Sequence, residues 1–103
     1  MSGGVPPAII LGIDPGTRVT GWGVVRLDGA DPRAVACDVI APKARLPLEQ
    51  RLAFIFTALA DVIARFEPQA VAVEEPFVGE SVRSAMAVGE ARTVAMLAAT
   101  LAG

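Results

Sequence analysis

A short apolar run that ends in an acidic residue occurs twice in this chain, once before and once after a helical pattern. The first run is Ala8–Asp14 (AIILGID) and the second is Ala70–Glu74 (AVAVE). Between them, Leu48–Phe66 carries large apolar residues at the spacing of one helix face. This order predicts an α/β fold in which the two runs can be neighbouring parallel strands.

Two further segments have the pattern of strands. Thr20–Leu27 follows the turn-forming residues Pro15-Gly16, and Ala34–Ile40 follows the strong turn signal Asp28-Gly29. The short connections predict an antiparallel meander formed by the first three strands. The apolar composition of Ala8–Asp14 further predicts a strand that is buried on both faces.

Two long helices are expected. Glu49 suits the first turn of the helix Leu48–Phe66, and Pro68 prevents its continuation. A second helix covers Ser81–Leu101, with Ser81 as its N-cap. This helix is apolar nearly all the way round, so we expect it to bury two sides, and Gly89 in its middle could allow another helix to approach closely.

Composition limits the chemistry that the chain can perform. The 103 residues are 53% hydrophobic and 19% charged, which indicates one globular domain, residues 8–103, after a flexible tail of residues 1–7. The net charge of -2 argues slightly against DNA binding, unless basic residues cluster on one face. The absence of histidine excludes histidine-ligated zinc and serine-histidine or cysteine-histidine catalysis, so carboxylates and hydroxyls remain.

The single cysteine, Cys37, cannot form a disulfide within the chain. No export signal and no apolar stretch long enough to cross a membrane are visible, so we expect a reducing cytoplasm and no membrane association. Cys37 lies within a strand pattern and is expected to be a small buried apolar residue.

The acidic ends of the two runs are the strongest candidates for a site. Ligand sites in open α/β sheets gather beyond the carboxyl ends of the central strands. If the two strands are parallel neighbours, Asp14 and Glu74 lie on strands about 4.8 Å apart. Close carboxylates repel each other unless a cation compensates, and Mg²⁺ prefers such oxygen ligands. The pair therefore predicts a divalent metal site, although an acid at a strand end is often only solvated.

The turn Asp14-Pro15-Gly16-Thr17 has a second interpretation. Glycine-rich turns with a leading aspartate also face the ATP phosphates of actin-like and sugar-kinase ATPases. Pro15 lacks a backbone N–H that a phosphate site would use, and the sequence shows no second phosphate loop. An actin-like ATPase or kinase fragment therefore remains an alternative.

Three segments resemble one known family in the right order. Leu11–Val25 (LGIDPGTRVTGWGVV), Ala72–Phe77 (AVEEPF) and Ala85–Ala99 (AMAVGEARTVAMLAA) are similar to the corresponding segments of RuvC-type Holliday-junction resolvases. The run DPGTRVTGWGV is much more restrictive than a generic glycine-rich loop. The resemblance extends from about Ala8 to the last residue.

The resemblance implies an RNase H-like fold, with three antiparallel strands and a parallel fourth strand in a mixed sheet flanked by helices. The family cuts four-way DNA junctions by paired nicks in recombination and repair, as a homodimer with two Mg²⁺ ions held by four carboxylates. Asp14 and Glu74 match two of these catalytic, metal-binding acids. The other two lie on a C-terminal helix that, with the preceding strand, is expected to be missing from a partial domain 8–103, so we expect this chain alone to cleave weakly or not at all.

The resemblance also suggests contacts with DNA and with other proteins. Phe77 matches an aromatic residue that wedges into the junction, although it could instead pack on the following helix. The two arginines are chosen by position and not by the resemblance: Arg18 lies nearest the predicted site and could contact a phosphate, and Arg83, near the start of the second helix, is a weaker candidate. We expect four-way junction DNA as the substrate and a homodimer through the Ser81–Leu101 helix, although that helix could instead pack on a further part of the protein. A branch-migration motor complex is a possible partner. The missing acids and the acidic charge leave a third alternative, a non-catalytic RNase H-like interaction module.

Overall fold

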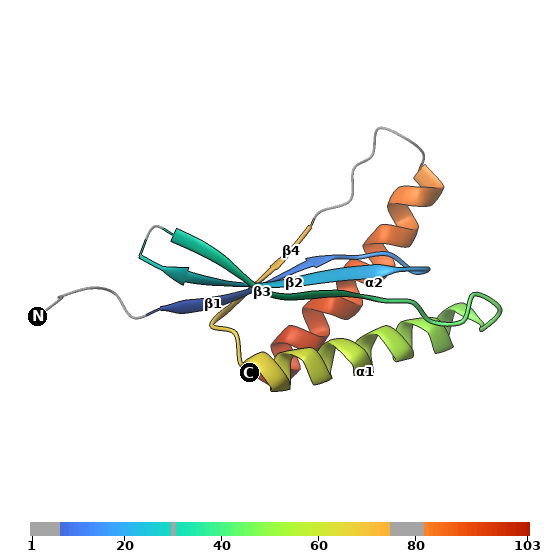
Figure 1. Cartoon of the computed structure of the whole chain (residues 1–103). Coiled ribbons are helices and arrows are strands. Elements are labelled where there is room, and N and C mark those ends of the chain that lie inside the picture. Colours follow the sequence, from blue (N-terminus) through green and yellow to red (C-terminus); the bar gives the residue numbers. More distant parts are fainter. Residues whose placement is uncertain (1–6, 30, 75–81) are drawn as a thin grey trace, which may run out of the picture.

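The computed structural model describes residues 7–29, 31–74 and 82–103, and of residues 82–88 only the backbone. Three strands are followed by a helix, a short strand and a second helix (Figure 1). Their bounds are β1 Ala8–Asp14, β2 Thr20–Asp28, β3 Asp31–Ile40, α1 Leu48–Phe66, β4 Ala70–Val73 and α2 Val82–Ala102. The predicted order of elements is confirmed. Residues 1–6 of the expected tail and the expected N-cap Ser81 lie outside the described residues.

The four strands form one sheet in the order β3-β2-β1-β4. β1 pairs antiparallel with β2, and β2 pairs antiparallel with β3, as the short turns predict. β1 pairs parallel with β4. The predicted mixed sheet is therefore confirmed, and β1 is the strand that joins its antiparallel and parallel parts.

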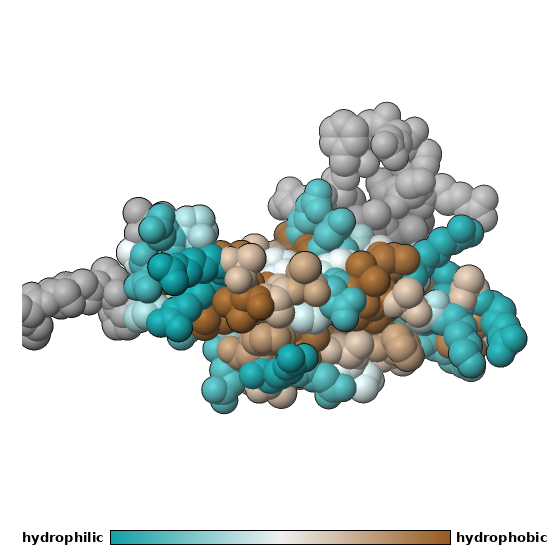
Figure 2. Space-filling view, viewed as in Figure 1, coloured by the Kyte–Doolittle hydropathy of each residue, from teal (hydrophilic) through white to brown (hydrophobic). Residues whose placement is uncertain are grey.

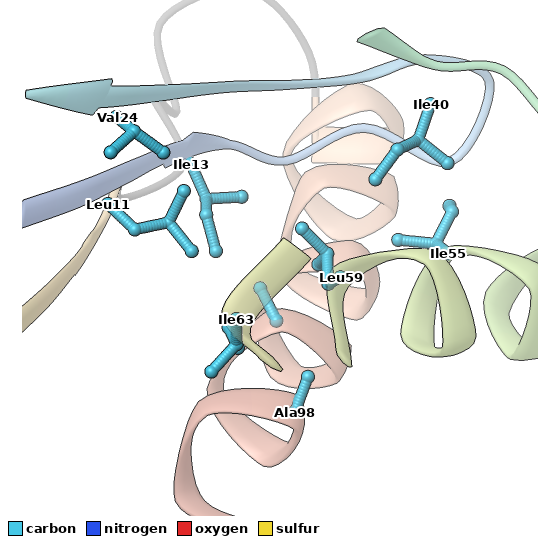
Figure 3. Close-up of a cluster of buried hydrophobic side chains, with 9 residues drawn as sticks. Leu11, Ile13, Val24, Ile40, Ile55, Leu59, Ile63 and Ala98 are labelled. Atoms are coloured by element: carbon cyan, nitrogen blue, oxygen red, sulfur yellow. The ribbon is translucent and has the colours of Figure 1, made fainter. Parts of the chain in front are cut away.

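Both helices pack on the same face of this sheet. Leu11 and Ile13 of β1 and Val24 of β2 point toward Leu59 and Ile63 of α1 (Figure 3). Side chains from both helices complete this core, with Ile55 in α1 and Ala95 and Ala98 in α2 almost fully buried. Every second residue of β1 and β2 thus faces the helices, as the two-residue period of a strand requires.

Helix α1 begins and ends as its sequence predicts. Glu49 lies in the first turn, and the helix stops at Phe66 because Glu67 adopts a left-handed conformation (φ 47°) before Pro68. The centroids of the Phe66 and Trp22 rings lie 5.7 Å apart. This ring contact holds the end of α1 against β2.

Two predictions about burial are wrong. β1 is not buried on both faces, because the helices cover only the face of Leu11 and Ile13, and Asp14 is exposed. Cys37 is exposed and not buried, because its strand position turns it away from the helices. The face of the sheet that carries Gly12, Asp14 and Cys37 is called the open face below.

Helix α2 buries only one side within the described residues. Ala91, Ala95 and Ala98 are buried, whereas Leu97 and Leu101 are 49% and 72% exposed. Figure 2 shows further apolar areas over the strands, between the polar ends of the molecule. The second buried side that we predicted for α2 is therefore not formed in this part of the chain. None of the described helices is long and apolar enough to span a bilayer.

A carboxylate pair at the ends of two parallel strands

Asp14 and Glu74 are brought together by the parallel pairing of β1 with β4. Ile13 pairs with Val73, and the Glu74 N–H donates a 3.0 Å hydrogen bond to the Ile13 carbonyl oxygen. The hydrogen bonding thus continues one residue past the end of β4, to Glu74, and both acids are exposed on the open face. Two side chains that are 60 positions apart in the sequence are therefore neighbours in space.

The two carboxyl groups are close enough to share a hydrogen bond. This bond, and next the negative charge of Asp14, raise the pKa of Glu74 above its usual 4.5, with a smaller contribution from desolvation. The pair therefore holds a proton more readily than an isolated glutamate. A divalent cation could replace that proton and compensate both charges, because carboxylate oxygens are suitable ligands for hard cations.

The turn after Asp14 is held closed from inside the protein. Thr20 is fully buried, and its hydroxyl accepts a 3.1 Å hydrogen bond from the Gly16 N–H. The same hydroxyl donates a 2.8 Å hydrogen bond to the Gly16 carbonyl oxygen. A side chain at Gly16 would approach the Val19 carbonyl oxygen more closely than real Cβ atoms approach other atoms. The turn is thus compact because residue 16 has no side chain and residue 20 has a hydroxyl.

The acids lie in a shallow hollow of about 680 Å³ on the open face. Its floor is made of glycines and small side chains, including Gly12, Gly21 and Ala72. Gly21 lies opposite Asp14 in the β1–β2 pairing, and a Cβ atom there would be 3.8 Å from the Asp14 Cβ atom. The small floor leaves both carboxylates accessible from the open face.

Of the three predicted DNA-binding residues, the structure describes the side chain of only one. Arg18 is exposed on the turn that begins after Asp14. Phe77 and the side chain of Arg83 lie outside the described residues. The described residues contain no group of three or more acidic, cysteine or histidine residues suited to a metal ion. Thr20 was missed as a site residue because a threonine at the start of a strand gives no sign that its hydroxyl closes the preceding turn.

Residues 10–102 match the family model of the crossover junction endodeoxyribonuclease RuvC. The chain belongs to this family. Curated RuvC relatives include that of Dehalococcoides mccartyi, 44% identical over 90 residues, and that of an Anaeromyxobacter species, 50% identical over 95 residues. These matches cover 87% and 92% of the chain but 54% and 46% of the relatives, so the chain spans about half the length of the RuvC proteins it matches.

A solved structure of a RuvC protein has the same arrangement. The Thermus thermophilus RuvC in complex with a Holliday junction substrate superposes with a TM-score of 0.85 at 36% identity. The match covers 93% of this chain and 59% of that RuvC. The RNase H-like fold predicted from the sequence resemblance is therefore confirmed.

Proposed function

We propose that this protein is a Mg²⁺-dependent endonuclease that resolves Holliday junctions, with Asp14 and Glu74 as catalytic metal ligands. The observation that carries the proposal is the convergence of these two carboxylates on the open face of a RuvC-family fold. The Thermus thermophilus RuvC, which is similar over nearly the whole of this chain, is described in complex with a Holliday junction. This supports four-way junction DNA as the substrate.

The residues present fit a divalent cation. Both carboxyl groups are accessible, lie close together and offer only oxygen ligands. A bound Mg²⁺ would act as a Lewis acid and stabilise the negative charge that develops on the phosphate oxygens during hydrolysis. Asp14 and Glu74 would hold the ion, and Arg18 on the adjacent turn would contact a DNA phosphate.

Two carboxylates can hold one ion, whereas the resemblance implies two ions and four acids. We therefore expect the 103 residues by themselves to bind a divalent cation but to cleave junction DNA weakly or not at all. Phe77 as a wedge, Arg83 as a DNA contact and the branch-migration motor as a partner stay predictions. A DNA substrate of this kind also supports the cytoplasm as the place of action.

We further propose that a homodimer forms through α2. The support is the exposed apolar surface of this helix, where Met96, Leu97 and Leu101 are 45%, 49% and 72% exposed. Packing of α2 on another part of a longer protein is the alternative. Size measurement of the chain in solution distinguishes the two, since a monomer at high concentration would rule out this dimer.

The actin-like ATPase alternative is disfavoured by the hydrogen bonds of the first turn. A phosphate site in this turn would need free backbone N–H groups. Pro15 has none, and the Gly16 N–H already donates to the Thr20 hydroxyl. ATP should therefore leave the melting temperature of the chain unchanged.

The proposal is tested by binding and cleavage measurements on one set of variants. Electron paramagnetic resonance measures the affinity for Mn²⁺. The wild-type chain should bind Mn²⁺ more tightly than Asp14→Asn and Glu74→Gln do. The matched control is Asp61→Asn, which changes an exposed acid on α1, outside the lining of the hollow, by the same chemistry. Equal binding by all four proteins would contradict the site. If neither Mg²⁺ nor junction DNA changes the stability of the wild type, the non-catalytic interaction module is the better interpretation.

Cleavage gives an independent test. We expect little nicking of a four-way junction by the wild-type chain in Mg²⁺, and none by Asp14→Asn. Robust cleavage by the wild type would show that the set of catalytic residues given above is wrong. Cleavage that survives Asp14→Asn would show that Asp14 is not a catalytic ligand.

A further inference from the structure

We propose that Thr20 is a positioning residue, whose buried hydroxyl fixes the turn after Asp14 and thereby holds the Asp14 carboxylate against Glu74. The inference rests on the proposed metal site, but it concerns a residue on the opposite face of the sheet. Thr20 contacts neither acid through any hydrogen bond of its side chain, since both its bonds go to Gly16.

The connection between Thr20 and Asp14 runs through two short paths. Along the chain, Pro15 alone separates Asp14 from Gly16, the residue that Thr20 holds at both its N–H and its carbonyl oxygen. Across the sheet, Asp14 pairs with Gly21, the residue after Thr20. The hydroxyl thus closes the turn between the last residue of β1 and the first of β2.

Burial makes this clamp rigid. Thr20 is fully buried, Pro15 is buried and Gly16 is half-buried, so water has only partial access to replace a lost hydrogen bond. Removal of the hydroxyl would leave two backbone groups of Gly16 without their partner, and the turn would have to move to find water. Since Asp14 is the residue before this turn, its carboxylate would lose its fixed place beside Glu74.

The test compares three variants of the 103-residue chain. Thr20→Val keeps the shape of the side chain and removes the hydroxyl, and Thr20→Ser keeps the hydroxyl. Ile63→Val is the control for a general loss of stability, because it trims a buried side chain of α1. Mn²⁺ affinity is measured by electron paramagnetic resonance, and exchange of the Gly16 amide hydrogen by NMR.

Thr20→Val should weaken Mn²⁺ binding by roughly 10-fold, as expected when a residue that orients a ligand is removed. The Gly16 amide should exchange faster in the same variant. Thr20→Ser should restore both properties, and Ile63→Val should leave Mn²⁺ affinity unchanged. Unchanged affinity in Thr20→Val, or an equal loss in Ile63→Val, would overturn the positioning role and leave the metal site intact.

A measurement on the wild type tests the same coupling without a variant. If the clamp and the cation site stabilise each other, saturating Mg²⁺ must slow exchange of the Gly16 amide, because such coupling is reciprocal. Binding of Mg²⁺ with no change at Gly16 would refute the coupling even if Thr20→Val failed to fold. A wild-type chain that binds neither Mg²⁺ nor Mn²⁺ would instead refute the proposed metal site, and the positioning role with it.

Discussion

Replacement of Gly16 by alanine is the sharpest test of the turn that carries Asp14. An ideal Cβ atom at this position would lie closer than 3.0 Å to the Val19 carbonyl oxygen. Because that neighbour is backbone, the strain cannot be relieved by a side-chain rotation. Overpacking of this kind costs about 1–3 kcal/mol. In a domain of this size each kcal/mol lowers the melting temperature by about 4–8 °C.

Gly12→Ala is the matched control. The nearest atom to a Cβ there is the Gly23 carbonyl oxygen at 3.8 Å, which is an ordinary contact. Alanine within a strand should even be about 0.5–1 kcal/mol better than glycine. Thermal melts followed by circular dichroism should therefore show a clear loss for Gly16→Ala and none for Gly12→Ala. Equal melting temperatures of Gly16→Ala and the wild type would refute the steric reasoning.

Three further predictions concern charge, packing and helix propensity. Asp14→Asn should lower the pKa of Glu74 toward 4.5, which a ¹³C carboxyl NMR titration measures. Since this pKa is raised in the folded chain, the pair stabilises the fold fully below the unfolded pKa and loses that contribution as the pH rises through the raised value. The melting temperature of the wild type relative to Asp14→Asn should therefore fall as the pH rises above 4.5, and a constant difference would contradict the pairing. Leu59→Ala, at a fully buried position, should cost about 2–5 kcal/mol in urea unfolding, whereas Leu97→Ala, at a 49% exposed one, should cost far less. Gly89→Ala should stabilise the chain by about 1 kcal/mol, because no described neighbour lies within 4 Å of its Cβ position; a loss of stability would show that glycine is needed there.

The sequence was sufficient to predict the elements and the meeting of the two acids. Local patterns set the bounds of β1 and α1, since β1 ends directly before Pro15 and α1 ends two residues before Pro68. The convergence of Asp14 and Glu74 followed from a general property of parallel strands, whose carboxyl ends lie at one edge of a sheet. No side-chain geometry was needed for that prediction.

Burial was predicted less well because it depends on what covers each face. The apolar composition of β1 shows that one face is suited to a core, but it cannot show whether a second layer covers the other face. The burial of Cys37 was predicted wrongly for the same reason, because its strand pattern does not show which face is covered. Thr20 could not be assigned because its role depends on the path of the turn, which brings Gly16 within reach of its hydroxyl.

The division of the sheet into two faces explains how one small fold can carry a pair of repelling charges. Ile13 of the core and Val73, which packs against the core, are followed directly by Asp14 and Glu74. Because successive side chains of a strand point to opposite faces, the residues that stabilise the fold also fix the acids without contacting them. Repulsion between the acids therefore acts on a pairing that the core already holds, and a cation that binds the pair adds stability to the same strand ends.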